Sequence, residues 1–171
     1  MKRDHFFLTF FLLLVTQILI CNFLQLSPYV TLTILPVMIL MIPVRYGVIF
    51  AMVLAFISGL SVDLLSEGIL GINSLALVPV ALLRRPIIRF IFGDEIFSRK
   101  EDISIRKHGV PKMSFAILLA QSLFLVIYIW ADSAGMRPFS FNLLRFILSL
   151  LPGWLLSLPF SSILAINNHD L

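Results

Sequence analysis

Charged residues are scarce in this chain of 171 residues, because only 13% are charged and 60% are hydrophobic. A soluble domain is usually about half apolar and about one quarter charged. The composition therefore predicts an integral membrane protein with a single domain. The chain has one cysteine, Cys21, so a disulfide framework within the chain is excluded.

Residue groups typical of an active site are also missing from the sequence. The three histidines, His5, His108 and His169, lie in polar or terminal segments, and no His, Cys and Asp residues cluster at metal-ligand spacing. No serine has a partner base, and no glycine-rich loop follows a strand. We therefore predict no catalytic residue, no metal site and no cofactor, and we expect that the protein is not an enzyme.

Long apolar runs predict where the membrane helices lie. A membrane-spanning helix needs about 20 apolar residues. The run at 30–65 exceeds one crossing, so we place a turn at 43–46. These runs predict an all-α membrane bundle of about six helices. The predicted spans are residues 6–23, 29–42, 46–64, 71–83, 113–130 and 141–164, and a polar loop covers 84–112.

The lysines and arginines predict the orientation of this bundle. With the N-terminus in the cytoplasm, 11 of the 13 basic residues lie inside, and only Arg137 and Arg145 lie outside. Both termini and the loop 84–112 are therefore predicted to be cytoplasmic. Arg145 either pairs with Asp132 or Asp63, or extends its charged end to the membrane interface, which we favour.

A basic surface is expected at the start of the cytoplasmic loop, at Arg84, Arg85 and Arg89. These side chains either bind anionic membrane lipids or a cytoplasmic partner, or only fix the topology. The topology also explains the net charge of +4, so we expect no nucleic-acid partner.

The segment at 51–71 carries the most specific pattern. Small residues recur every four positions at Ala51, Ala55 and Gly59, and Asp63 continues the series on the same helix face. Such a face lets two membrane helices approach closely. The face serves either an internal helix contact, which is the more common use, or a dimer.

Asp63 lies 17 residues after Tyr46, or roughly 26 Å along a helix, near the outer end of the predicted third span. One interpretation is a buried carboxylate that binds a partner, a proton or a substrate. The other, which we favour, is that it accepts hydrogen bonds from the free N–H groups at the start of the next helix. Gly68 and Gly71 would allow the tight turn between the two helices.

The pattern Gly59-x-x-x-Asp63-Leu64-x-x-x-Gly68-x-Leu70-Gly71, followed by an apolar helix and a basic loop, resembles the rod shape-determining protein MreD family. The resemblance implies a non-enzymatic, multi-pass inner-membrane subunit of the bacterial cell-elongation machinery, which scaffolds regulation of peptidoglycan synthesis and cell shape. It also implies binding to a bitopic MreC-like protein. The MreB-like filament, a RodA-like glycosyltransferase and the elongation transpeptidase are further implied partners.

That family is similar in fold to the six-helix substrate-binding subunits of energy-coupling-factor vitamin transporters. The similarity gives an alternative function, which is a substrate-binding membrane subunit of a small-molecule transporter. This alternative predicts a pocket near the outer end of spans three, four and six. The polar residues available to line it are Asp63, Asn73, Ser74, Gln121 and Asn142.

Overall fold

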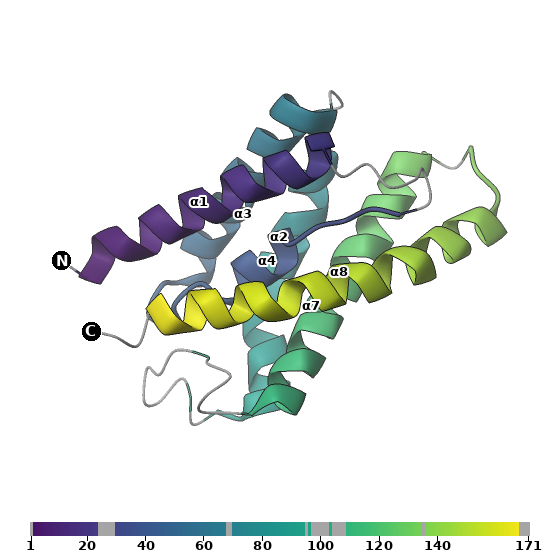
Figure 1. Ribbon diagram of the computed structural model, residues 1–171. Helices are drawn as coiled ribbons and strands as arrows, with labels where there is room; N and C mark the ends of the chain where they lie inside the picture. Colours follow the sequence, from purple (N-terminus) through teal and green to yellow (C-terminus); the bar gives the residue numbers. More distant parts are fainter. Residues whose placement is uncertain are drawn as a thin grey trace.

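The computed structural model describes residues 2–23, 30–67, 70–94, 96, 103, 109–134 and 136–167, and this part of the chain is predominantly helical (Figure 1). The all-α class predicted from the sequence is confirmed for these residues. The helices are α1 (Lys2–Phe23), α2 (Leu35–Leu40), α3 (Val48–Val62), α4 (Ile72–Phe92), α7 (Val110–Ser133) and α8 (Phe139–Asn167), and a π-helical turn, η1 (Asp63–Glu67), continues α3.

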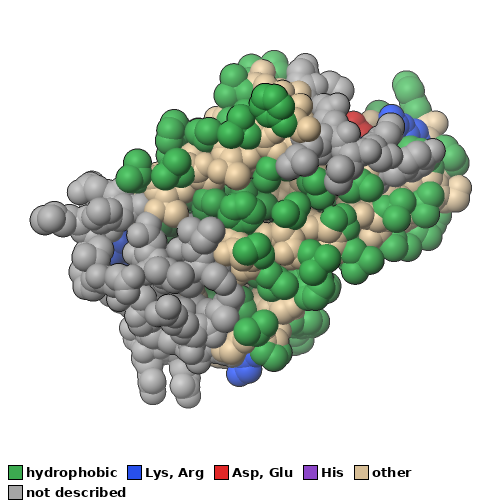
Figure 2. Space-filling model, viewed as in Figure 1, with side chains coloured by type: hydrophobic (Ala, Val, Ile, Leu, Met, Phe, Trp, Pro, Cys, Tyr) green, Lys and Arg blue, Asp and Glu red, His purple; other side chains and the backbone are tan. Residues whose placement is uncertain are grey.

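Four helical stretches of the described chain are long and apolar enough to cross a membrane, by length and composition. They are Phe6–Phe23, Val48–Ser66, Val110–Ser133 and Phe139–Ser161. These stretches correspond to the predicted spans at 6–23, 46–64, 113–130 and 141–164. Figure 2 shows hydrophobic side chains over much of the described surface on one face, as expected for a surface that contacts lipid.

The prediction of a span at 29–42 was wrong, because the described residues of this region, 30–42, contain only the six-residue helix α2. Pro36 lies at the start of α2, where a missing N–H is tolerated. Pro43 disfavours a helical conformation at Ile42 and so limits the helix at its other end. All residues from 32 to 44 are buried, so this apolar run is enclosed by protein rather than lipid.

One helix includes the predicted fourth span, 71–83, almost completely and extends into the segment predicted as a polar loop, 84–112. α4 continues through Pro79 and Pro86 to Phe92, and it ends at Gly93, whose φ of 85° suits glycine. The helix continues because arginines are good helix formers and because Ile88 is fully buried against its neighbours. With three arginines, α4 is not one of the four apolar stretches.

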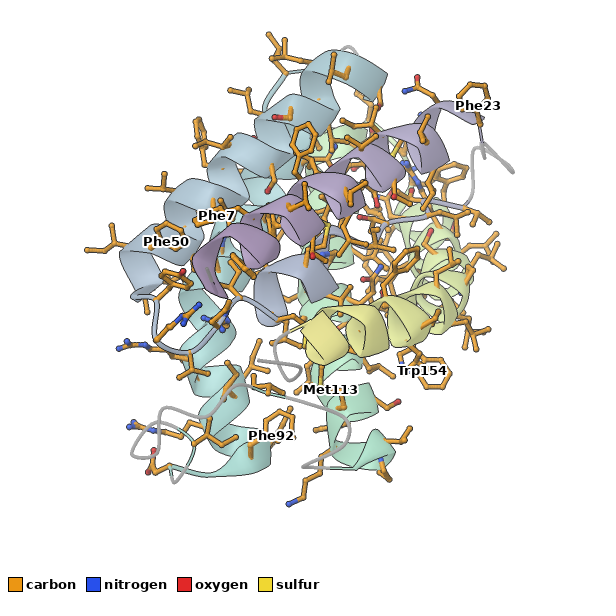
Figure 3. All side chains as sticks on the ribbon, turned by 60° about the vertical axis from the view of Figure 1, so that its left-hand side comes forward. Phe7, Phe23, Phe50, Phe92, Met113 and Trp154 are labelled. Atoms are coloured by element: carbon orange, nitrogen blue, oxygen red, sulfur yellow. The ribbon has the colours of Figure 1, made fainter. Side chains whose placement is uncertain are left out.

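The short helix α2 lies in the middle of the bundle, where it contacts α1, α3, α4, α7 and α8. Along the chain, α3 packs on α4, α4 on α7, and α7 on α8. Figure 1 shows α1 and α8 running across the view, whereas α4 and α7 run up and down it. The rings of Phe7 in α1 and Phe50 in α3 meet edge to face with centroids 6.4 Å apart (Figure 3).

Candidate functional site

The Asp63 side chain connects the end of α3 to the beginning of α4. It is fully buried, and its oxygens accept hydrogen bonds from Gly71 N at 2.9 Å, Asn73 N at 3.0 Å and Asn73 Nδ2 at 2.9 Å. Ser74 N and Ser74 Oγ lie at 3.5 Å from Oδ2. The prediction that Asp63 would accept hydrogen bonds from the N–H groups at the start of the next helix is confirmed.

Local sequence explains this joint. The first N–H groups of a helix have no acceptor within that helix, and a carboxyl group is favourable near a helix N-terminus. Gly71 precedes α4 with a φ of 99°, a left-handed conformation that glycine adopts without strain. Gly68, the other predicted turn residue, lies outside the described residues.

The small-residue face of α3 packs closely on α4. Ala51 and Ala55 are fully buried. A Cβ atom added to Gly59 would lie 2.6 Å from both N and Cα of Ser74, so only glycine fits at this position. The prediction of an internal helix contact is therefore confirmed for this face.

A second polar site holds the non-helical segment 30–34, and its main contact comes from α1. Gln17 is buried, and its side-chain oxygen accepts a hydrogen bond from Ile34 N at 2.7 Å. Its side-chain nitrogen donates to Leu32 O at 3.3 Å. One glutamine thus satisfies an acceptor and a donor of the segment's backbone.

Side chains of α7 and α8 bind two further backbone groups of this segment. Gln121, which is fully buried, donates from Nε2 to Thr33 O at 3.3 Å. Ser149 Oγ accepts from Thr31 N at 2.9 Å. Non-helical backbone is tolerated at membrane depth only where protein or water satisfies its polar groups. These side chains therefore allow segment 30–34 to lie inside the bundle.

We expect Gln17→Leu to destabilise the protein. The substitution leaves Leu32 O and Ile34 N buried without their partner, and each unsatisfied group costs about 1–3 kcal/mol. Gln17→Glu keeps an acceptor for Ile34 N but removes the donor to Leu32 O, so it should also reduce stability. Thermal unfolding in detergent micelles measures both. A Gln17→Leu protein as stable as wild type would contradict this role.

Of the three arginines of the predicted basic surface, one is buried and two are exposed in the structure. Arg84 is buried, and its Nε donates to Leu40 O at 3.0 Å, at the C-terminal end of α2. Arg85 and Arg89 are exposed, and Arg89 forms an ion pair with Asp94. The expectation that Arg84 belongs to that surface was therefore wrong. Spacings of four place Arg84 on the same helix face as the buried residues Val80 and Ile88.

Arg84→Met should reduce stability, because it removes a charge-assisted hydrogen bond to a helix C-terminus, worth about 1.5–3 kcal/mol. Arg84→Lys keeps the charge without the guanidinium geometry and should recover part of the loss. The control is Arg85→Met, one position along the same helix at an exposed site, which should change stability by less than about 0.5 kcal/mol. Equal effects at the two positions would contradict a specific role for Arg84.

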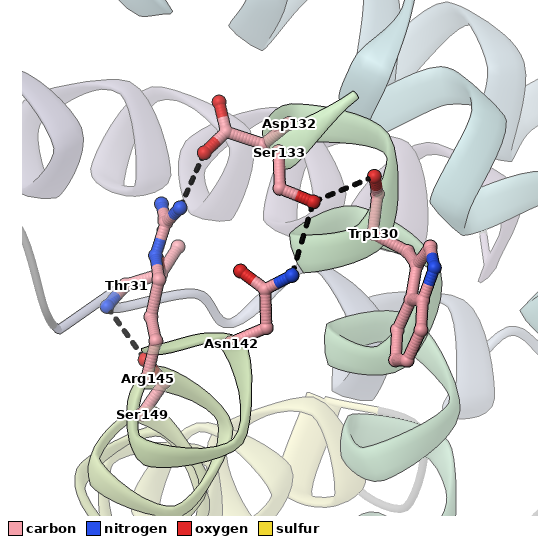
Figure 4. A network of polar contacts seen from close by, with 7 residues as sticks. All are labelled: Thr31, Trp130, Asp132, Ser133, Asn142, Arg145 and Ser149. Carbon is pink, nitrogen blue, oxygen red and sulfur yellow. Dashed lines mark hydrogen bonds and ion pairs between the residues drawn. The ribbon is translucent and has the colours of Figure 1, made fainter. Parts of the chain in front are cut away.

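A third polar site joins the ends of α7 and α8 (Figure 4). Arg145 is buried and forms an ion pair with Asp132. Its Nη2 donates to Thr31 Oγ1 at 3.2 Å, and its guanidinium lies 5.7 Å from the ring centroid of Tyr128. The favoured expectation that Arg145 extends to the interface was wrong, and the alternative pairing with Asp132 is correct. The α7–α8 hairpin brings these two residues together.

The residues expected to line a ligand pocket are divided between these sites. Asn73 and Ser74 bind Asp63, Gln121 binds segment 30–34, and Asn142 donates to Ser133 Oγ at 3.1 Å. In the part of the chain that the structure describes, no three His, Cys, Asp or Glu residues form a group that could hold a metal ion. The chain matches no family model, no curated protein and no solved structure.

Proposed function

We propose that this protein is a non-enzymatic, multi-pass subunit of the cell-elongation machinery in the bacterial inner membrane, with both termini in the cytoplasm. The residue pattern from Gly59 to Gly71 supports this proposal through its resemblance to the MreD family. The proposal rests mainly on the observation that the side chain of Asp63 stabilises the fold. Its oxygens accept hydrogen bonds from Gly71 and Asn73, so Asp63 joins α3 to α4, as expected of a residue with a structural role.

Other buried polar side chains form hydrogen bonds to the backbone, which favours a scaffold over a substrate-binding subunit. Gln17 and Gln121 bind the backbone of segment 30–34, and Arg84 binds the end of α2. Such contacts stabilise one arrangement of helices. A small-molecule site instead needs several polar groups that converge on one concave pocket. A scaffold leaves its outer helix faces for contacts with other membrane proteins.

The proposed partners are an MreC-like bitopic protein, an MreB-like filament, a RodA-like glycosyltransferase and the elongation transpeptidase. Affinity purification of the tagged full-length chain from its host membranes tests the first of them. We expect an MreC-like protein to co-purify, and depletion of the chain to turn rod-shaped cells round. A tagged multi-pass protein of similar size, expressed at the same level, is the control.

Two results would contradict the proposal. One is normal cell shape after depletion. The other is failure to recover an MreC-like protein with a tagged chain that restores cell shape. A vitamin-sized molecule that remains bound through purification, detected by native mass spectrometry, would instead favour the transporter subunit. The presence of an MreC-like gene beside the gene for this chain would be independent support.

A further inference from the structure

The orientation of the Asn142 side-chain amide is fixed by its neighbours. Ser133 Oγ donates its hydrogen to Trp130 O at 3.1 Å, so the hydroxyl oxygen is left to accept. Asn142 Nδ2 donates to that oxygen at 3.1 Å. The amide nitrogen therefore points to Ser133, and Oδ1 points away from it, toward the side chain of Arg145 (Figure 4).

The Arg145 guanidinium also has a nitrogen without a hydrogen-bond partner among the described residues. Nη1 forms the ion pair with Asp132, and Nη2 donates to Thr31 Oγ1. Nε of Arg145 and Oδ1 of Asn142 have no hydrogen-bond partner among the described residues. Both residues are more than nine-tenths buried, with exposed fractions of 8% and 7%. A buried donor and a buried acceptor without partners thus belong to residues three positions apart in α8, and the Asn142 oxygen lies on the side of Arg145 (Figure 4).

We propose that a water molecule binds between Arg145 Nε and Asn142 Oδ1. It accepts a hydrogen bond from the guanidinium and donates one to the amide oxygen, which satisfies both groups. Buried polar groups in native proteins nearly always have a partner, and buried waters typically make about three hydrogen bonds to such groups. Water is the smallest ligand that can both accept and donate at a single point.

The water would complete a polar junction of three elements. Asn142 and Arg145 lie in α8, Ser133 and Asp132 lie at the end of α7, and Arg145 also reaches Thr31 in segment 30–34. The direct contacts of Asn142 with Ser133, and of Arg145 with Asp132 and Thr31, each connect two side chains. The bound water connects the amide of Asn142 to the guanidinium of Arg145. It thereby links the Asn142–Ser133 hydrogen bond to the contacts that Arg145 makes with Asp132 and Thr31.

NMR spectroscopy of the full-length protein, labelled with ¹⁵N-arginine in lipid nanodiscs, tests this site. Arg145→Lys identifies the Nε–H signal of Arg145. We expect dipolar magnetisation transfer from water to this proton. In the rotating frame its cross-peak has the sign opposite to that of proton exchange, so the two processes can be distinguished. The exposed Arg137 is the internal control, and it should show exchange with solvent only.

Asn142→Leu removes the acceptor, and the dipolar signal at Arg145 should be lost. If this variant does not fold, the wild-type spectrum alone tests whether water is bound at Arg145 Nε. The proposal is overturned if wild type shows no dipolar signal from water. It is also overturned if scalar coupling reveals a direct hydrogen bond from Arg145 Nε–H to the amide oxygen of Asn142. It is also overturned by transfer from carbon-bound protons of a different small ligand, or by an unchanged signal in a folded Asn142→Leu protein.

Discussion

Gly59→Ala should destabilise the protein by roughly 2–4 kcal/mol, from overpacking and from disturbed hydrogen bonds. In most helices this substitution is favourable, because alanine has the higher helix propensity, by about 1 kcal/mol. Here the added Cβ would lie 2.6 Å from N and Cα of Ser74. Those atoms belong to the backbone of α4 and cannot move aside as a flexible side chain would.

The clash should also disturb the Asp63 joint, because Ser74 follows Asn73, which donates two of the hydrogen bonds. Thermal unfolding in detergent, followed by circular dichroism and by the fluorescence of the two tryptophans, measures the effect. The matched control is Gly47→Ala, because a Cβ at Gly47 would have no atom within 4 Å. Its effect should stay below about 1 kcal/mol. A Gly59→Ala protein more stable than wild type would contradict the close approach of α3 and α4.

Asp63→Ala should be the second strongly destabilising substitution, with a loss of roughly 3–5 kcal/mol. It removes the acceptor for Gly71 N and Asn73 N, and each buried donor left unsatisfied costs about 1–3 kcal/mol. The Asn73 side chain also loses its partner. The favourable interaction of an acid with the N-terminus of α4 is lost as well. Chemical and thermal unfolding in micelles should both report this loss.

Asp63→Asn keeps the size and shape of the side chain but removes its negative charge and one of its two oxygen acceptors. The amide retains one oxygen, so it can still accept at one of the two positions, but its NH₂ group then faces N–H donors at the other. We expect a loss of about half that of Asp63→Ala, on the order of 2 kcal/mol. If Asp63→Asn retains wild-type stability and cells that carry it retain their shape, the carboxyl group is not required.

The Asp63 joint was predictable from sequence because its parts are close together along the chain. Asp63 and Gly71 are eight residues apart, and the small residues before Asp63 define one helix face. Only a helix, a turn and the free N–H groups of a second helix were needed for the prediction. The four long apolar helices were predictable for a similar reason, because length and composition identify each of them independently.

The position of α2 was not predictable in this way. An apolar run has the same composition whether it faces lipid or lies inside a bundle. The contacts that distinguish the two cases join distant parts of the chain, such as Gln121 to Thr33 and Arg84 to Leu40. Prolines at 36 and 43 were visible in the sequence, and they were the available signal for a short helix. The sequence left the pairing of Arg145 with Asp132 as one of several alternatives, because the two residues lie on different helices.

The central position of α2 has a consequence for how the chain assembles in the membrane. Segment 30–34 is synthesised early, but two of the side chains that satisfy its backbone, Gln121 and Ser149, are synthesised roughly a hundred residues later. Burial of this segment therefore cannot be completed until α7 and α8 have entered the bilayer. The first half of the chain therefore remains partly assembled during synthesis, and segment 30–34 reaches its final packing only after α8 has been translated.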